Sequence, residues 1–334
     1  MKSEAEFMAR ALRLAERGLG HTRPNPAVGA VVVKGGRIVG EGWHKRAGGD
    51  HAEVAAIKNA MRRGGCNGTT RTTGTDGTGN RLLKGATIYV TLEPCSKPGR
   101  VGACTDAIAA AGISRVVYAI PDPNPKNRGK AKRALAKSGI ECMRFDGDGS
   151  VLDEAENLIR GFRKHVLTGL PYVTVKIAMS LDGKICDDWG DAKWVSSEAA
   201  RRETGRLRER VDAIMVGGET VRRDNPSLLS HGKPNPDLVR VVVSKSGRLP
   251  KGSQVFTDGA PNRTLVFDDA RKALAELGGM GITHVLCEGG LCLARSLAEQ
   301  GLVDEWITVL APKVIGSRRI GSAVEIGRTS CLQG

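Results

Sequence analysis

Three side chains of the types that hold a catalytic zinc ion stand in the first third of the chain: His51, Cys95 and Cys104. One imidazole and two thiolates form a ligand set that leaves the fourth position of the metal open for water. Glu53 follows His51 by two residues, and a carboxylate at that position suits proton transfer from water to a leaving amine. The pattern therefore predicts hydrolytic deamination.

The spacing of the two cysteines leaves an alternative open. Zinc deaminases pair His-x-Glu with Pro-Cys-x-x-Cys, whereas eight residues separate Cys95 from Cys104 in this chain. In the alternative, both cysteines are ordinary buried thiols, and His51 and Glu53 are a solvated surface pair. The expected elements favour the metal site, because a strand over 87–92 leads into Cys95 and helices begin at His51 and Cys104. Two positive helix ends would then face the ion and favour thiolate over thiol.

Length and composition define the class of protein. A chain of 334 residues predicts two domains of ordinary size. We expect a soluble, cytoplasmic protein, since the sequence shows neither an apolar run of membrane-spanning length nor a secretory leader. The eight cysteines are scattered along the chain, which favours metal binding or burial over disulfides.

The net charge of +15 is compatible with two kinds of partner. Nucleic acid is one, because Lys and Arg neutralise phosphates. However, the basic residues are spread out, and aromatic residues, which stack on bases in single-strand binders, make up only 4%. A small phosphorylated substrate and a phosphorylated cofactor would benefit from the same positive field. We therefore expect small anionic ligands and no nucleic-acid partner.

The first half of the chain predicts alternating helices and strands. Ser3 and Glu6 form a capping box for a first helix, and Gly35-Gly36 predicts a hairpin between two strands. The stretch 64–80 has no periodicity and is expected to be a surface insertion. The other expected elements are strands 27–33, 37–41, 87–92 and 115–120 and helices 51–62, 104–111 and 129–138. Such alternation is typical of a helix-covered sheet.

The second half begins after a polar, Gly-rich seam at 146–150, and a helix over 151–167 is expected to bridge two domains. Strands are expected at 172–178, 212–217, 238–244, 263–267 and 282–287, and helices at 196–209, from Glu219, at 269–277 and at 291–299.

Gly289-Gly290 opens the last helix, where backbone N–H groups can approach a phosphate, although tight packing explains such a pair equally well. No Gly-x-Gly-x-x-Gly follows the first strand, so a Rossmann domain is not indicated.

Several motifs together resemble a known family. In the first half they are His21-Thr22-Arg23-Pro24-Asn25-Pro26, His51-Ala52-Glu53, Leu92-Glu93-Pro94-Cys95-Ser96 and Asp122-Pro123-Asn124-Pro125. In this order and spacing the chain resembles the bifunctional riboflavin-biosynthesis deaminase/reductase. The resemblance continues through Lys176–Gly183, Lys193-Trp194, Ala200-Arg201-Arg202, Asp224–Leu228 and Leu310-Ala311-Pro312-Lys313, and so covers nearly the whole chain.

For the first half, the resemblance implies a cytidine-deaminase-like α/β domain over residues 1–147. Its zinc ligands would be His51, Cys95 and Cys104, its proton shuttle Glu53, and the longer cysteine spacing is usual in that family. Asn25 and His44 match positions that hold the pyrimidine; without the resemblance they would be a turn-capping Asn and a surface His. The substrate implied is 2,5-diamino-6-(5-phosphoribosylamino)pyrimidin-4-one.

For the second half, the resemblance implies a dihydrofolate-reductase-like domain over residues 148–334 that uses NADPH to reduce the ribosyl group to ribityl. The substrate would contact Lys176, Arg208, Leu228 and Glu288. The cofactor would contact Ala178, Trp194, Thr220, Asp224, Ser244, Gly290, Leu291, Cys292, Leu293, Ala294, Arg295 and Ser296. Such a site needs cofactor and substrate stacked in a dry cleft more than it needs a strong acid.

The chain departs from the family pattern in three places. Lys97-Pro98 and Val101-Gly102-Ala103 replace a histidine pair and prolines, and His231 stands near the position of a usual arginine. The chain also ends at Gly334, short of the strand that usually closes the sheet, so we expect a homo-oligomer to support the second domain. The alternative function is a nucleic-acid or nucleoside deaminase with an appended binding domain.

Overall fold

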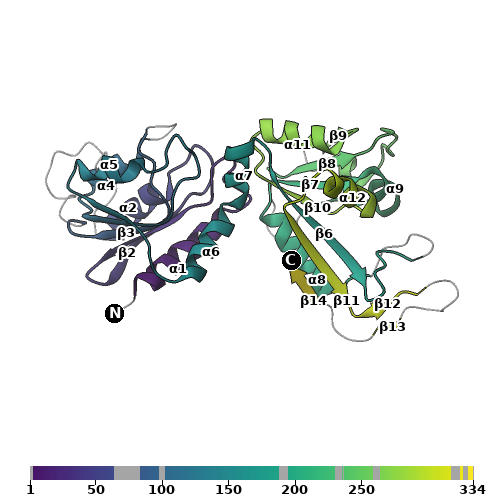
Figure 1. The fold of residues 1–334 in the computed structure, drawn as a ribbon, viewed down its shortest axis with the longest axis horizontal. Coiled ribbons are helices and arrows are strands. Elements are labelled where there is room, and N and C mark those ends of the chain that lie inside the picture. Colours follow the sequence, from purple (N-terminus) through teal and green to yellow (C-terminus); the bar gives the residue numbers. More distant parts are fainter. Residues whose placement is uncertain are drawn as a thin grey trace. The chain divides into compact units, whose positions relative to one another are not determined.

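The computed structural model describes residues 3–63, 83–97, 102–187, 195–229, 235, 237–258, 264–316, 324–325 and 330–333. The chain forms two compact units, Met1–Leu167 and Thr168–Gly334, and Figure 1 labels most of their elements. The sequence placed the domain boundary after residue 147, whereas segment 148–167 makes its contacts within the first unit. As a functional boundary, 147/148 stays a prediction. Within the described ranges, no helix combines the length and the hydropathy that crossing a bilayer requires.

The described part of the first unit forms a five-stranded sheet in the order β2-β1-β3-β4-β5. β1 is antiparallel to β2 and β3, while β3, β4 and β5 run parallel. The Gly-Gly hairpin is confirmed, because Gly35 and Gly36 adopt φ of 56° and 71° as a two-residue type I′ turn requires. The strands are β1 Gly29–Lys34, β2 Arg37–Trp43, β3 Thr87–Leu92, β4 Arg115–Ile120 and β5 Glu141–Arg144.

Helices cover both faces of this sheet. Gly29 faces α1, because a Cβ at Gly29 would lie 2.0 Å from the Ala11 carbonyl oxygen. Gly42 faces α2, because a Cβ there would lie 2.3 Å from the Ala56 nitrogen. Gly42 pairs with Ala30, the neighbour of Gly29, so α1 and α2 lie on opposite faces. The helices are α1 Glu4–Ala15, α2 Ala52–Arg63, α4 Cys104–Ala110, α5 Lys130–Ala136, α6 Gly149–Leu158 and α7 Arg160–Thr168.

The single helix expected over 151–167 is in fact two helices, α6 and α7. Ile159 separates them with φ of −107°, outside the helical range, and its side chain is buried. α6 lies beside α1 (Figure 1), while Phe162 of α7 packs against the core of the first unit. The one local signal is Gly161, two residues after Ile159, and a single glycine inside a helical pattern does not by itself predict a break.

The second unit contains a seven-stranded sheet, among the described residues, in the order β14-β11-β6-β10-β7-β8-β9. All neighbours are parallel except β14, which is antiparallel to β11. The sequence analysis expected the chain to end short of a closing strand, whereas β14 pairs along this edge. The strands are β6 Tyr172–Ser180, β7 Ala213–Gly217, β8 Val239–Val243, β9 Thr264–Phe267, β10 His284–Cys287, β11 Glu305–Ala311, β12 Lys313–Val314, β13 Val324–Glu325 and β14 Ser330–Gln333.

Two apolar cores lie on the two faces of this sheet. Ala213 and Met215 contribute to one core, and Ile214 and Val216 to the other, as alternation along a buried parallel strand requires. α11 and α12 supply the first core, and α9 and α10 supply the second. The helices are α8 Glu198–Glu209, α9 Gly218–Asp224, α10 Gln254–Thr257, α11 Ala270–Gly279 and α12 Leu291–Glu299. The sequence analysis named neither β5 nor β11 as a strand.

Candidate active sites

His51, Cys95 and Cys104 converge in the first unit, as predicted. The Nδ1 atom of His51 lies 3.1 Å from Cys104 Sγ and 3.6 Å from Cys95 Sγ. All ligand atoms of the three side chains lie within 4.8 Å of one another. Within the part of the chain that the structure describes, this is the one group of three His, Cys, Asp or Glu side chains close enough to share a metal ion.

Each ligand sits at the end of an element, which fixes its backbone. The His51 carbonyl accepts the Ala55 N–H at 2.9 Å, so His51 begins the hydrogen bonding of α2. β3 delivers the chain to Cys95, whose carbonyl accepts the Thr105 N–H at 3.2 Å. Cys104 is the first residue of α4, and its N–H donates to Cys95 Sγ at 3.4 Å. The two cysteines are therefore held together by backbone as well as by side chain.

The electrostatics of the pair favour a thiolate. Hydrogen bonding to Cys104 lowers the pKa of Cys95 to about 4, and the same hydrogen bond raises the pKa of Cys104 well above its ordinary value. The pair therefore readily provides a thiolate at Cys95. A thiolate beside an imidazole nitrogen is a donor set that Zn²⁺ prefers.

The spacing of these atoms also fits zinc. Zn–S bonds of about 2.3 Å and Zn–N bonds of about 2.0–2.1 Å in a tetrahedron place nitrogen and sulfur about 3.5 Å apart. The two nitrogen-sulfur distances of 3.1 and 3.6 Å bracket that value. The residues present therefore fit a zinc ion with three protein ligands.

Glu53 lies in the first turn of α2 and is buried, with 4% of its surface exposed. Burial raises the pKa of Glu53 above its ordinary value, and the negative charge of Cys95 adds to the effect. A buried carboxyl group with a raised pKa is suited to accept a proton and release it again near neutral pH.

A cavity of about 230 Å³ opens beside these residues and is lined by Asn25, His44, His51, Glu53 and Cys95. His44 Nδ1 donates to the Asp50 carbonyl oxygen at 2.9 Å, so its Nε2 is free of a proton in the neutral ring and accepts from Asn25 Nδ2 at 3.1 Å. Burial lowers the pKa of His44, which favours this neutral form. The structure thus brings Asn25 and His44 to the predicted metal site.

Eight lining residues were not among the predicted site residues: Pro26, Val28, Ala52, Leu92, Glu93, Asn124, Asn127 and Phe162. Asn124 and Asn127 lie in the loop after β4, and Phe162 lies in α7. The Asp-Pro-Asn-Pro motif was a signal for Asn124, since it follows a strand whose carboxyl end meets that of β3. Nothing local to Phe162 indicated a role.

A second cavity, of about 390 Å³, lies in the second unit. Its lining includes eight predicted site residues: Lys176, Ala178, Arg208, Thr220, Asp224, Glu288, Gly290 and Leu291. Apolar residues Ile177, Ile185 and Val195 and polar residues Ser196, Arg201, Thr204 and Gly289, which were not predicted as contacts, complete the lining. Of these, Arg201 was quoted within a family motif.

Arg208 and Glu288 form a two-pronged ion pair in this cavity. Arg208 Nε and Nη2 donate to the two carboxylate oxygens of Glu288 at 2.7 and 3.0 Å, and Nη1 donates to the Leu229 carbonyl at 3.0 Å. The two side chains are only 14% and 10% exposed. Burial works against the charged form, but the Glu288 carboxylate raises the pKa of Arg208 above its ordinary value. Arg208 is therefore a largely buried, paired residue of the cavity, although it lies on a helix rich in arginines.

We expect Arg208→Met to destabilise the second unit by about 3–5 kcal/mol, because it leaves the Glu288 carboxylate buried without a partner. The double variant Arg208→Met/Glu288→Leu should recover most of this loss, since neither charge remains. Denaturant-induced unfolding measures both effects. Arg206→Met is the matched control on the same helix, because the pair Arg206–Glu203 is 68% and 60% exposed and should contribute less than about 1 kcal/mol. Equal losses for Arg206→Met and Arg208→Met would contradict the prediction.

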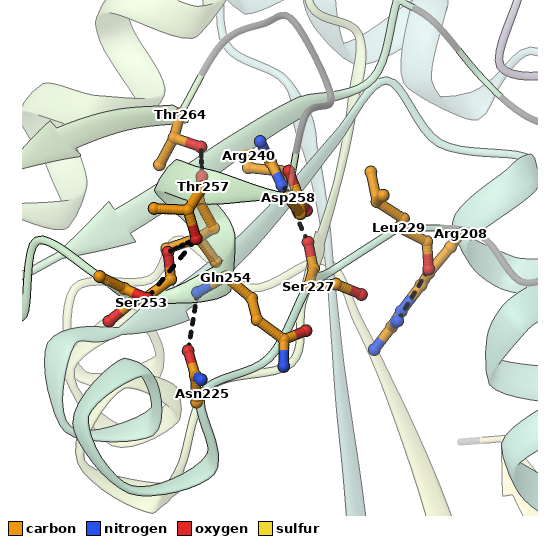
Figure 2. A network of polar contacts seen from close by, with 12 residues as sticks. Arg208, Asn225, Ser227, Leu229, Arg240, Ser253, Gln254, Thr257, Asp258 and Thr264 are labelled. Carbon is orange, nitrogen blue, oxygen red and sulfur yellow. Dashed lines mark hydrogen bonds and ion pairs between the residues drawn. The ribbon is translucent and has the colours of Figure 1, made fainter.

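The loop that carries Leu229 is itself held in place. Figure 2 shows Arg240 between Ser227 and Asp258, with its Nη1 donating to the Ser227 carbonyl at 3.1 Å. Asn225 and Leu228 adopt φ of 43° and 60°, the left-handed region that non-glycine residues rarely occupy. The contacts of Arg240 with Ser227 and of Arg208 with Leu229 flank Leu228 and so hold its left-handed backbone in place.

Two features of the second unit fit a phosphorylated cofactor: a glycine turn in the lining of the second cavity, and a buried serine that is not part of that lining. Gly290 precedes α12, and a Cβ built on it would meet nothing within 4 Å, so its backbone is accessible beside a helix amino end. Ser244 is only 6% exposed, and its Oγ has no hydrogen-bond partner among the described residues. A polar ligand would supply the hydrogen-bond partner that the buried Ser244 hydroxyl lacks. The open space at Gly290 would let a phosphate of that ligand approach the backbone.

The remaining predicted contacts lie outside the lining. Leu228 is buried in an apolar core, so it could reach a ligand only through its backbone. Leu293 and Ala294 pack into the other core, Arg295 pairs with Glu299, and the Ser296 hydroxyl accepts from Gln300. Cys292 is exposed. Trp194, His231 and the insertion 64–80 lie outside the described residues. The assignment of these residues to cofactor or substrate stays a prediction.

Comparisons with known proteins match one family model to each of the two units that contain the cavities. Residues 1–120 match the family model described as the cytidine and deoxycytidylate deaminase zinc-binding region, and residues 171–327 match that of the RibD C-terminal domain. The riboflavin biosynthesis protein RibD of Escherichia coli (strain K12) is 36% identical over 346 residues, which cover 93% of this chain and 88% of the relative. The protein of the same name from Bacillus amyloliquefaciens is 39% identical over 343 residues, covering 94% and 85%.

Solved structures are similar over almost the full length. RibD of Acinetobacter baumannii, form 1, superposes with a TM-score of 0.80 at 31% identity and covers 98% of this chain and 97% of its own. A diaminohydroxyphosphoribosylaminopyrimidine deaminase/5-amino-6-(5-phosphoribosylamino)uracil reductase from Thermotoga maritima gives a TM-score of 0.81 at 34% identity, covering 98% and 90%. The similarity therefore extends through both units.

Proposed function

The chain belongs to the family of bifunctional riboflavin-biosynthesis deaminase/reductases, and from this premise we propose which of its residues carry each reaction. It is a zinc-dependent deaminase and an NADPH-dependent reductase that acts on a small molecule. The predicted fold class, an α/β cytidine-deaminase-like domain followed by a reductase domain, is confirmed. The observation that carries the proposal is the convergence of His51, Cys95 and Cys104 beside a cavity that Glu53 also lines.

In the deaminase, we assign the zinc ion to His51, Cys95 and Cys104. Zinc bound there supplies a Lewis acid that lowers the pKa of water and so allows hydrolysis near neutral pH. Glu53 takes a proton from water and returns it to the leaving amine, a role that its raised pKa supports. Asn25 and His44 hold the pyrimidine, and the hydrogen bond from His44 to Asp50 keeps the imidazole in one orientation.

In the reductase, bound NADPH supplies the hydride. The backbone N–H groups of the glycine turn before α12 would hold the cofactor phosphates, and Thr220 and Asp224, which line the same cavity, would contact its polar groups elsewhere. Lys176 and Arg208 present positive charge to the ribosyl phosphate, and Glu288 keeps Arg208 in place. The apolar side chains Ile177 and Ile185 exclude water from the reacting atoms. We propose that this site reduces the ribosyl group to ribityl.

We propose 2,5-diamino-6-(5-phosphoribosylamino)pyrimidin-4-one as the substrate of the first step, since a relative of 34% identity carries the corresponding deaminase name. A cytoplasmic location and a homo-oligomeric state are part of the same proposal. Nucleic acid is not a proposed partner, because the second unit matches a reductase family model instead of a binding domain. A nucleic-acid deaminase is therefore the disfavoured alternative.

The experiment that tests this function follows both steps in one sample. The purified chain should release one equivalent of ammonia from the pyrimidine substrate and then oxidise NADPH, whose consumption is monitored by absorbance. After treatment with a zinc chelator, ammonia release should stop, while NADPH oxidation with the deaminated intermediate should continue. Ammonia release from an oligonucleotide, with a strongly salt-dependent affinity, would instead support the alternative.

A further inference from the structure

Glu93 is a buried carboxylate that neither the metal ligands nor the proton shuttle explains. It follows β3 directly, stands two residues before Cys95, and is 4% exposed. Its Oε2 accepts the backbone N–H groups of Asp122 and Gly129 at 3.2 and 3.0 Å, and its Oε1 accepts that of Ala131 at 3.2 Å. One side chain thus binds both ends of the loop that joins β4 to α5.

That loop forms one wall of the deaminase cavity through Asn124 and Asn127. Inside the loop, Asp122 Oδ1 accepts the Asn124 N–H at 2.8 Å, and Asp122 Oδ2 accepts from Asn127 Nδ2 at 3.0 Å. No described helix or strand lies between β4 and α5, so no backbone ladder fixes this stretch. We call Asn124 and Asn127 the amide wall.

The strength of the three bonds explains why Glu93 can fix the wall. Hydrogen bonds to an ionised group are roughly twice as strong as those between neutral groups. A buried carboxylate persists only when such donors compensate its charge. Two of the three donors, Asp122 and Gly129, belong to the loop, and the third, Ala131, lies in the first turn of α5. Gln at this position would present an NH₂ group to N–H donors, and Asp would be too short to reach them.

We propose that Glu93 is a positioning residue of the deaminase, which fixes the amide wall relative to Cys95 and thereby sets how tightly the cavity holds the pyrimidine. This inference rests on the proposed function. It differs from the role of Glu53, because Glu93 acts through the loop and moves no proton. Loss of Glu93 should therefore weaken substrate binding more than it slows the chemical step.

The test uses the full-length, zinc-loaded enzyme with Glu93→Gln. We expect a roughly 10- to 100-fold loss of deaminase kcat/KM, the usual effect of removing a supporting hydrogen-bond partner, most of it as an increase in KM. Zinc content and reductase activity should not change. Glu16→Gln, an exposed glutamate of the same unit, is the matched control and should behave as wild type.

A double-mutant cycle separates positioning from general support of the fold. If Glu93 acts through the amide wall, Glu93→Gln and Asn124→Ala should be strongly non-additive in kcat/KM. Should Glu93→Gln fail to fold, Glu93→Asp takes its place in the cycle, and the same rise in KM is expected. An unchanged KM, additive effects, or loss of zinc would each overturn the inference. Absence of deamination in the wild type would instead overturn the proposed function.

Discussion

Replacing Cys104 by alanine is expected to remove zinc from the chain and to reduce deamination to the uncatalysed background. Two of three protein ligands remain in this variant, and His51 Nδ1 loses the sulfur atom 3.1 Å away. A catalytic zinc with three protein ligands depends on each of them, and binding is coupled to the thiolate that the pair of cysteines stabilises. Metal analysis of the purified chain and an ammonia assay measure the two losses.

The reductase should retain its activity in Cys104→Ala, because the residues that line the second cavity all belong to the second unit. Cys142→Ala is the matched control, since Cys142 is likewise a buried thiol of the first unit but lies in β5, away from the metal ligands. This control should keep zinc and both activities. One zinc per chain together with full deamination in Cys104→Ala would contradict the assignment of the ligand.

Glu53→Gln should keep the metal and lose the chemistry. The substitution preserves the size of the side chain but removes the group that accepts a proton, and general acid–base catalysis typically contributes about 10²–10⁴-fold. We therefore expect kcat for deamination to fall by roughly that factor, with zinc content and KM close to wild type. Glu53 is buried beside the ligands without being one of them, so metal binding has no reason to fail.

Steady-state kinetics at matched zinc content measures this effect. Glu93→Gln is an informative comparison, because Glu53 and Glu93 are both buried in the wall of the same cavity. Substitution of Glu53 should lower kcat, whereas substitution of Glu93 should raise KM. Wild-type kcat in Glu53→Gln would exclude this carboxylate from proton transfer. Loss of zinc in Glu53→Gln would indicate instead that Glu53 supports the metal.

The sequence alone allowed the convergence of His51, Cys95 and Cys104 to be predicted, because each lies at the end of an element with a strong local signal. The alternating apolar run 87–92 indicates a strand that ends near Cys95, and helix signals follow both His51 and Cys104. Family motifs then extended the prediction to eight lining residues of the second cavity. Residue type and local periodicity carry this information, since both depend only on neighbours in the chain.

The tertiary structure decided which distant side chains meet. No periodicity links Phe162 or Asn127 to the cavity of His51. The sheet order, with β3 beside β4, brings Asn127 there, and the packing of α7 against the core of the first unit brings Phe162. Likewise, the pairing of Arg208 with Glu288 and the three bonds to Glu93 join residues 29 to 80 positions apart. Residue types and their order were therefore enough to predict which side chains carry out the chemistry. The residues that form the walls of the cavities could be identified only from the tertiary structure, because the long-range pairing of strands that brings them together is not encoded in local sequence.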